Sequence, residues 1–182
     1  MSHLTVLAGP TAVGKGTIVR YLLEHFDNIH LSISATTRTK RPDEIDGVHY
    51  YFMTHEQFDE LVLTGQMLEY ATVHGENKYG TPRKPVEEAL SEGKFVLLEI
   101  DLQGARQIKA TMPSADLVFI APPSWEELVK RLQGRGTEDA DEQARRLETA
   151  RIELAAQHEF DHVVINDDVA RCAYEVLDLM QA

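Results

Sequence analysis

Residues 9–17 have the composition and spacing of a phosphate-binding loop. They read GPTAVGKGT, with glycines at 9 and 14 and Lys15 directly after the second glycine. An apolar run at 4–8 precedes the loop, and apolar residues at helical spacing follow it over 18–26. In such a strand–loop–helix unit, backbone N–H groups and the helix dipole face an anion, and the lysine adds a mobile cation. We therefore predict a nucleotide-phosphate site. Its predicted residues are Gly9, Pro10, Thr11, Ala12, Val13, Gly14, Lys15, Gly16 and Thr17.

The hydroxyl of this loop is displaced by one residue from its commonest place. Gly16 stands directly after the lysine, where a serine or threonine hydroxyl usually contacts Mg²⁺, and Thr17 follows it. The sequence therefore leaves the direct ligands of a metal ion unassigned.

A pair of arginines forms the second cationic group. Arg38 and Arg41 lie three residues apart in the stretch SATTRTKRP, which begins at Ser34. Guanidinium groups bind phosphate oxygens in a forked, bidentate geometry. Arginines at this spacing are also common on protein surfaces, but together with the loop at 9–17 they predict two phosphorylated substrates.

Four short apolar runs predict the strands that position the phosphate-binding loop and the two arginines. These runs predict buried strands at 4–8, 95–100, 117–121 and 163–165. Helical patterns separate most of them, which is typical of a parallel sheet with helices on both faces, an α/β fold. The carboxyl ends of parallel strands form the ligand-binding edge, and the 9–17 loop, Asp101 and Asn166 all follow such ends. Since a charge that ends a buried strand needs a local partner, we expect a functional role for Asp101.

The chain is expected to form one domain, 1–182, in which two segments depart from the alternation of strands and helices. Residues 32–81 predict a small, mainly antiparallel subdomain inserted into the core. Residues 134–157 begin with a polar, glycine-containing stretch and continue as a helix, which predicts a short lid and its following helix. The core is then made of residues 1–31, 82–133 and 158–182.

Composition narrows the classes of partner. The formal net charge is -12 and the chain has one cysteine, so an internal disulfide is impossible and a basic surface for nucleic acid or anionic membrane is not expected. Apolar runs of membrane-spanning length are absent from the sequence. We expect a cytoplasmic protein with small-molecule substrates. The oligomeric state is not predicted.

Taken together, the motifs resemble those of the guanylate kinases, which transfer phosphate from ATP to GMP. The resemblance covers nearly the whole chain and places a phosphate-loop core, a GMP-binding subdomain and a lid in one domain. The motifs that carry it are residues 14–17, 34–42, 46–52, 69–71, 79–81, 99–105, 131–138, 146–147 and 164–168. It implies ATP as phosphate donor and Mg²⁺ as cofactor.

The resemblance also implies roles for individual residues. Contacts with the GMP phosphate are implied for Ser34, Arg38, Arg41, Tyr50 and Tyr79. Contacts with guanine are implied for Glu69, Thr81 and Asp101. Positions near adenine are implied for Arg131 and Asn166. Stabilisation of the transferring phosphoryl group is implied for Lys15, Arg38, Arg41, Arg135 and Arg146.

The chemistry of guanine gives a reason for the pocket residues. Guanine donates from N1 and N2 and accepts at O6, so a carboxylate such as Glu69 or Asp101 accepts from the first pair, and the Thr81 hydroxyl can donate to O6. Adenine would leave a buried carboxylate unpaired, and sites of this kind reject the wrong ligand by roughly 10⁴-fold. Without the resemblance, the sequence favours an ordinary exposed strand carboxylate at Glu69 over a functional one.

The expected mechanism needs no general base, because the acceptor is a phosphate oxygen that is already anionic. Catalysis then consists of in-line positioning, cations around the transferring group and domain closure that excludes water. Two alternatives remain open at this point. One is a non-catalytic guanylate-kinase-like binding module, and the other is a kinase of the same fold that acts on a phosphorylated sugar.

Overall fold

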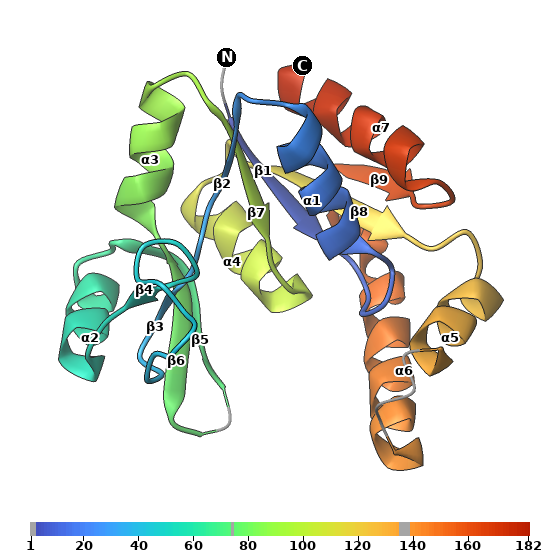
Figure 1. Cartoon of the computed structure of the whole chain (residues 1–182), viewed down its shortest axis with the longest axis horizontal. Coiled ribbons are helices and arrows are strands. Elements are labelled where there is room, and N and C mark those ends of the chain that lie inside the picture. The colour runs from blue at the N-terminus through green and yellow to red at the C-terminus, as the bar shows by residue number, and fades with distance from the viewer. Residues whose placement is uncertain (1–2, 74, 135–138) are drawn as a thin grey trace.

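A parallel sheet of five strands forms the centre of the chain (Figure 1). The computed structural model describes residues 3–73, 75–134 and 139–182. The strand order is β2-β7-β1-β8-β9, and every neighbouring pair in this sheet is parallel. The strands are β1 (Leu4–Ala8), β2 (Ile29–Leu31), β7 (Phe95–Glu99), β8 (Asp116–Ala121) and β9 (His162–Ile165). The parallel α/β core predicted from the four apolar runs is confirmed, and β2 is added to it.

Helices cover both faces of this sheet, and each face has its own hydrophobic core. The first core packs the sheet against α1 (Lys15–His25), α5 (Trp125–Gln133), α6 (Ala140–Ala155) and α7 (Val169–Gln181). The second packs it against α3 (Arg83–Ser91) and α4 (Leu102–Thr111). Along β1, Leu4, Val6 and Ala8 face the second core and Leu7 faces the first. Because both faces are covered, the strand is buried at every position, Thr5 included, instead of alternating between buried and exposed.

The small sheet has the order β4-β3-β6-β5. Its strands are β3 (Ala35–Thr36), β4 (Tyr51–Phe52), β5 (Met67–Val73) and β6 (Asn77–Pro82), and α2 (His55–Leu63) lies beside them. The β3–β6 and β5–β6 pairs are antiparallel, whereas β3–β4 is parallel. The sheet is therefore mixed, with most of its pairing antiparallel.

Side-chain caps fix the starts of three helices. Thr54 and Gln57 form a reciprocal capping box at the start of α2, and the Ser124 side chain accepts from the Glu127 N–H at the start of α5. Asp139 caps α6 in the same way, by accepting from the Glu142 N–H. The helix predicted in the second half of residues 134–157 thus begins at a side-chain cap.

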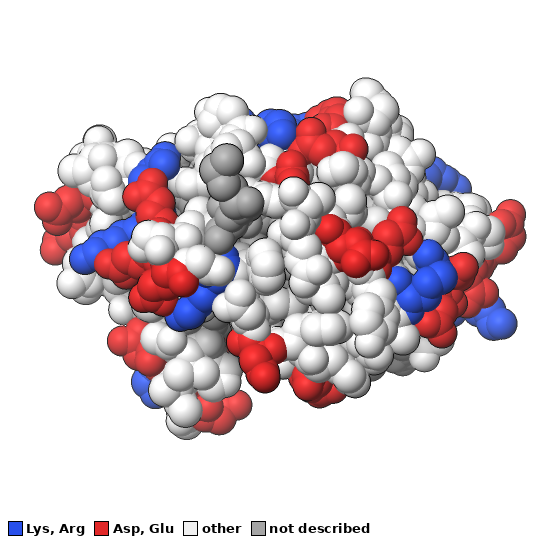
Figure 2. Space-filling model, turned by 90° about the horizontal axis from the view of Figure 1, so that it is seen from above, with Lys and Arg blue, Asp and Glu red and all other residues white. Residues whose placement is uncertain are grey.

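The small sheet is joined to the core through β5. Leu68 of β5 is fully buried and belongs to the same hydrophobic cluster as Val6 and Ile108. The other end of the small sheet, with α2, extends away from the larger sheet (Figure 1). On the face shown in Figure 2, acidic side chains form several clusters and basic side chains lie next to them.

Candidate functional site

The phosphate loop connects β1 to α1 and depends on two glycines. Gly9 has φ +150°, and an added Cβ would lie 2.4 Å from the Ile120 carbonyl oxygen. Gly14 has φ +100°, and an added Cβ would lie 2.6 Å from Nδ2 of Asn166. Both contacts are shorter than any side chain tolerates, and the φ of Gly14 also lies in the left-handed region that favours glycine. The predicted turn is therefore built on these two residues.

The loop encloses a cavity of about 260 Å³. Its lining consists of Pro10, Thr11, Ala12, Gly14, Lys15, Gly16, Thr17 and Glu99. Seven of these eight residues belong to the predicted 9–17 loop. Glu99 comes from the carboxyl end of β7, the strand next to β1. The cavity thus lies at the sheet edge where the sequence places it, at the N-terminus of α1.

Arg131 and Asn166 bind the main chain of the phosphate loop at Val13. Nδ2 of Asn166 donates to the Val13 carbonyl at 2.8 Å, and Nη1 of Arg131 donates to the same oxygen at 3.3 Å. Nη2 of Arg131 also donates to the Asn166 carbonyl at 3.3 Å. Asn166 is only 4% exposed. These residues, expected near adenine, therefore also fix the loop backbone.

Lys15 is partly buried and has acidic neighbours. Its ammonium group donates to the Gly9 carbonyl. Burial lowers the pKa of Lys15, while the charges of Glu153, Glu99 and Asp101 oppose that shift. Oε2 of Glu153 is buried and has no hydrogen-bond partner among the described residues. Sequence reasoning missed Glu153, because nothing in its position on α6 indicates that it faces the loop.

A second cavity, of about 180 Å³, lies between the small sheet and the start of α4. It is lined by Ser34, Glu69, Ala71, Val73, Tyr79, Ile100, Asp101, Gln103, Gly104 and Gln107. Four of the residues implied to bind GMP, namely Ser34, Glu69, Tyr79 and Asp101, therefore meet in one cavity. They come from the segment before β3, from β5 and β6, and from the cap of α4.

Glu69 is a buried carboxylate at 9% exposure. Burial raises the pKa of Glu69, the nearby Asp101 charge raises it further, and the Thr81 hydrogen bond opposes both. The Thr81 hydroxyl donates to Oε1 of Glu69 at 2.7 Å. A hydroxyl has one proton, so Thr81 in this arrangement orients Glu69 and does not offer a donor to guanine O6.

Asp101 combines two roles at the end of β7. Its Oδ1 accepts from the Gly104 N–H at 2.8 Å and caps α4. The same residue lines the second cavity. The expectation that Asp101 has a local partner is met by this cap, which fixes the carboxylate at the cavity wall.

Arg38 is held by a carboxylate that sequence reasoning missed. Its Nη1 and Nη2 bind both oxygens of Glu44, at 3.1 and 2.7 Å. The Arg38 hydrogen bonds lower the pKa of Glu44 to about 2, with help from the Arg41 backbone N–H. Oε2 of Glu44 accepts from that N–H at 2.8 Å. Glu44 thereby joins the two predicted arginines into one unit. A glutamate in a polar loop gives no signal of this role.

Aromatic rings surround the Arg38 guanidinium. Its Cζ lies 5.4 Å from the Tyr50 ring centre and 5.8 Å from that of Phe52. The Tyr50 and Tyr79 rings contact edge to face at 6.0 Å. Arg38, Tyr50 and Tyr79, which the resemblance assigns to one phosphate, are therefore neighbours in space.

The predicted lid arginines are only partly described. Arg135 lies outside the described residues. Arg146 lies on α6, where its Nη2 donates to Glu142 at 2.8 Å one turn away. The structure does not bring Arg146 into either cavity lining.

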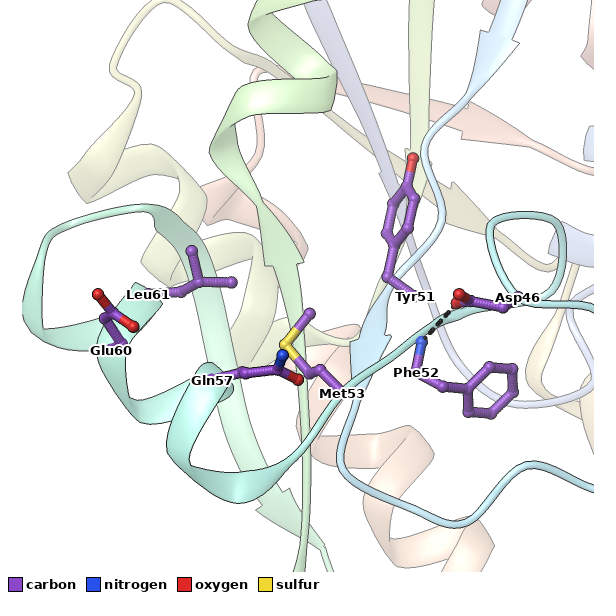
Figure 3. Close-up of a pocket in the computed structure, with 7 residues that line it drawn as sticks. All are labelled: Asp46, Tyr51, Phe52, Met53, Gln57, Glu60 and Leu61. Atoms are coloured by element: carbon purple, nitrogen blue, oxygen red, sulfur yellow. Dashed lines mark hydrogen bonds between the residues drawn. The ribbon is translucent and has the colours of Figure 1, made fainter.

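A third cavity, of about 420 Å³, lies beside β4 and α2 (Figure 3). Asp46, Tyr51, Phe52, Met53, Gln57, Glu60 and Leu61 line it. Oδ1 of Asp46 accepts from the Phe52 N–H at 2.9 Å, which ties the preceding loop to β4. Its lining contains none of the residues predicted to act in phosphate transfer, so we assign the chemistry to the other two cavities.

Neither a membrane helix nor a protein-built metal cluster is found in the described ranges. None of the helices described is long and apolar enough to cross a membrane. In the same residues, no three His, Cys, Asp or Glu side chains are grouped to hold a metal ion.

Comparisons with known proteins agree over the full length. The family model described as "Guanylate kinase" matches residues 1–182. The chain is 63% identical to "Guanylate kinase" of Leifsonia xyli subsp. xyli, over 98% of this chain and 70% of the relative. It is 56% identical to "Guanylate kinase" of Thermobifida fusca, over 99% and 91% of the two chains.

Solved structures show the same fold. The crystal structure of guanylate kinase from Anaplasma phagocytophilum aligns with a TM-score of 0.70 and 34% identity, covering 99% of this chain and 84% of that one. The shikimate kinase structure from Bacteroides thetaiotaomicron aligns with a TM-score of 0.54 at 11% identity, covering 100% of both chains. The second likeness concerns the fold alone.

Proposed function

The chain belongs to the guanylate kinase family, and we propose where each of its two substrates binds. Its activity is that of the family, the conversion of ATP and GMP to ADP and GDP. The proposal concerns which cavity takes which nucleotide and which side chains act on it.

The loop cavity is proposed to hold the ATP phosphates. Glycine-built turns at a helix N-terminus bind phosphate through backbone N–H groups, and Lys15 at the same place supplies a cation. The pKa of Lys15 is lowered by burial but supported by three acidic neighbours. Arriving phosphates replace those acidic charges as partners of the ammonium, so ATP binding stabilises the charged lysine.

The second cavity is proposed to hold GMP, and one observation carries this proposal. Glu69 and Asp101 are two carboxylates in one small cavity, and Glu69 is almost fully buried. A buried carboxylate without a cationic partner is costly, and the donors at N1 and N2 of guanine would satisfy it. Adenine has no donor at N1, so the buried Glu69 carboxylate would stay unpaired and its desolvation cost would remain.

The acceptor phosphate is proposed to bind beside Arg38, Tyr50 and Tyr79. Arg38 is already oriented by both oxygens of Glu44, so its guanidinium loses little freedom when a phosphate arrives. Arg41 is tied to the same glutamate through its backbone N–H. We infer that Glu44 positions the pair of arginines for the phosphate.

The donor set at the loop fits a magnesium ion that is carried by the nucleotide. Mg²⁺ usually keeps several waters and takes one or two protein oxygens together with substrate phosphates. Thr17 and Glu99, both in the loop cavity, are the protein groups that would hold it. When bound, Mg²⁺ neutralises phosphate charge and lowers the repulsion between the two substrates.

The protein side chains then act by position and charge. The phosphate oxygen of GMP attacks in line without losing a proton, so no general base is required. Lys15 and the arginines hold positive charge around the transferring group. We propose that Arg146, and Arg135 from the lid, join them when the domain closes around both nucleotides and excludes water.

Kinetics of two variants separate the cavities. Lys15→Ala is expected to reduce kcat by at least a hundredfold at an unchanged melting temperature, because it removes a phosphate-loop cation. Arg38→Ala is expected to raise the KM for GMP more than the KM for ATP. If Arg38→Ala raises only the KM for ATP, the assignment of the acceptor phosphate is wrong.

Steady-state kinetics with other acceptors also test which molecules the second cavity accepts. The 2′-hydroxyl of GMP has no partner assigned in the second cavity, so we propose that dGMP is also accepted. We further propose that the chain acts in the cytoplasm on free nucleotides. A phosphorylated sugar is disfavoured as acceptor, because it offers no N–H donors to Glu69 and Asp101.

A further inference from the structure

Gln107 on α4 binds the main chain of β5 through both ends of its amide group. Its Oε1 accepts from the Tyr70 N–H at 3.0 Å, and its Nε2 donates to the Tyr70 carbonyl at 3.0 Å. β5 is the last strand of the small sheet, with β6 on its other side. The amide of Gln107 therefore takes the place that a further strand would have, and satisfies two edge groups of β5.

This contact lies where the two carboxylates of the second cavity are brought together. Asp101 caps α4 at its start, less than two turns before Gln107. Glu69 is the neighbour of Tyr70 on β5, and Gln107 lines the same cavity as both carboxylates. The distance between Asp101 and Glu69 thus depends on how α4 is held against β5.

Repulsion between the carboxylates works against that contact. The Asp101 charge raises the pKa of Glu69, which means that it disfavours the ionised form of Glu69. Because Glu69 is buried, water screens this repulsion less than it would between two exposed carboxylates. A paired hydrogen bond between α4 and β5 opposes it directly.

We propose that Gln107 is a positioning residue for guanine discrimination. By fixing β5 to α4 at Tyr70, it sets the spacing of Glu69 and Asp101 to the N1 and N2 donors of guanine. The proposal rests on the proposed binding of GMP in this cavity. It adds a residue that touches no reacting group and acts through the strand.

Thr111 offers a matched control on the same pair of elements. Its hydroxyl donates to the Leu68 carbonyl at 2.7 Å, so it also ties α4 to β5. The Leu68 side chain is buried in the core and absent from the cavity lining. Thr111→Val therefore removes an α4–β5 hydrogen bond one turn further from Asp101 along α4, while both Gln107–Tyr70 hydrogen bonds stay in place.

The test compares GMP with IMP, which lacks the 2-amino donor, in the full-length protein. Gln107→Met keeps the length of the side chain but neither hydrogen bond. It is expected to raise the KM for GMP about tenfold, equivalent to roughly 1.4 kcal/mol, with kcat and the KM for ATP within threefold of wild type. The preference for GMP over IMP is expected to fall, and the Tyr70 amide to exchange hydrogen faster.

Thr111→Val is expected to lower the melting temperature while leaving the preference for GMP over IMP unchanged. An unchanged preference in Gln107→Met, or an equal loss in Thr111→Val, overturns the inference. If Gln107→Met does not fold, Gln107→Asn serves instead, since its shorter amide cannot reach both Tyr70 groups. An unchanged preference in that variant also overturns it.

Glu69→Gln distinguishes failure of the inference from failure of the proposed pocket. If Glu69→Gln changes the preference and Gln107→Met does not, only the role of Gln107 is wrong. If Glu69→Gln leaves GMP and IMP unaffected, the pocket assignment is wrong and the inference falls with it.

Discussion

Replacing Gly14 by alanine tests the physical basis of the phosphate loop. At φ +100° an alanine costs roughly 1–2 kcal/mol, because its Cβ crowds the backbone in the left-handed region. The new Cβ would lie 2.6 Å from Nδ2 of Asn166. Displacing that amide breaks its hydrogen bond to Val13 and leaves the buried Asn166 amide without this partner, which costs about 1–3 kcal/mol more. We expect Gly14→Ala to lose about 2–5 kcal/mol of unfolding free energy.

The assay is denaturant unfolding at neutral pH, with Gly16→Ala as the matched control two residues away. No atom lies within 4 Å of the position of an added Cβ at Gly16, which is in the first turn of α1. Gly16→Ala is therefore expected to change stability by less than about 1 kcal/mol.

A double variant separates the two parts of the cost. In the Asn166→Ala background the contact with Nδ2 is gone, so Gly14→Ala is expected to cost only the roughly 1–2 kcal/mol of backbone strain. If Gly14→Ala and Gly16→Ala are equally stable, or if the cost of Gly14→Ala is the same in both backgrounds, the reasoning is refuted.

Two further predictions concern the pH of the assay and the removal of Mg²⁺. Burial raises the pKa of Glu69 above its usual 4.5, so the carboxylate takes up a proton at a higher pH than an exposed glutamate does. The KM for GMP is then expected to rise on acidification through that raised pKa, and a pH profile of Glu69→Gln that keeps this limb would contradict the assignment. Chelating Mg²⁺ with EDTA is expected to abolish turnover. It is expected to leave GMP binding to the ATP-free protein unchanged in calorimetry. A loss of GMP binding would instead place the metal ion in the second cavity, against the proposal.

The core was predictable because its signals are local. β1 is apolar except for Thr5, and the loop after it carries its glycines where the turn requires them. β2 was not predicted, since it is three residues long and contains His30. It becomes a strand through its pairing with β7. The two-residue strands of the small sheet depend in the same way on tertiary pairing.

The site was predictable where a residue type carries the chemistry and hidden where a residue acts through another. Lys15 and Asp101 stand out as charges near strand and helix ends, whereas Glu69 is singled out only by the resemblance. Glu44 and Gln107 are ordinary polar residues in sequence, and only the fold shows that one orients Arg38 and the other holds β5. The Thr81 hydroxyl was expected to face guanine, whereas here it donates to Glu69.

The most direct test of the account is the preference for GMP over AMP in a coupled ADP-release assay with Mg-ATP. With the wild-type chain, kcat/KM for GMP is predicted to exceed that for AMP at least about a hundredfold, because adenine leaves a buried carboxylate unpaired. Glu69→Gln is predicted to bring the two values closer together. Comparable turnover of both nucleotides by the wild-type chain, or an unchanged ratio in Glu69→Gln, would contradict the claim that Glu69 and Asp101 select guanine.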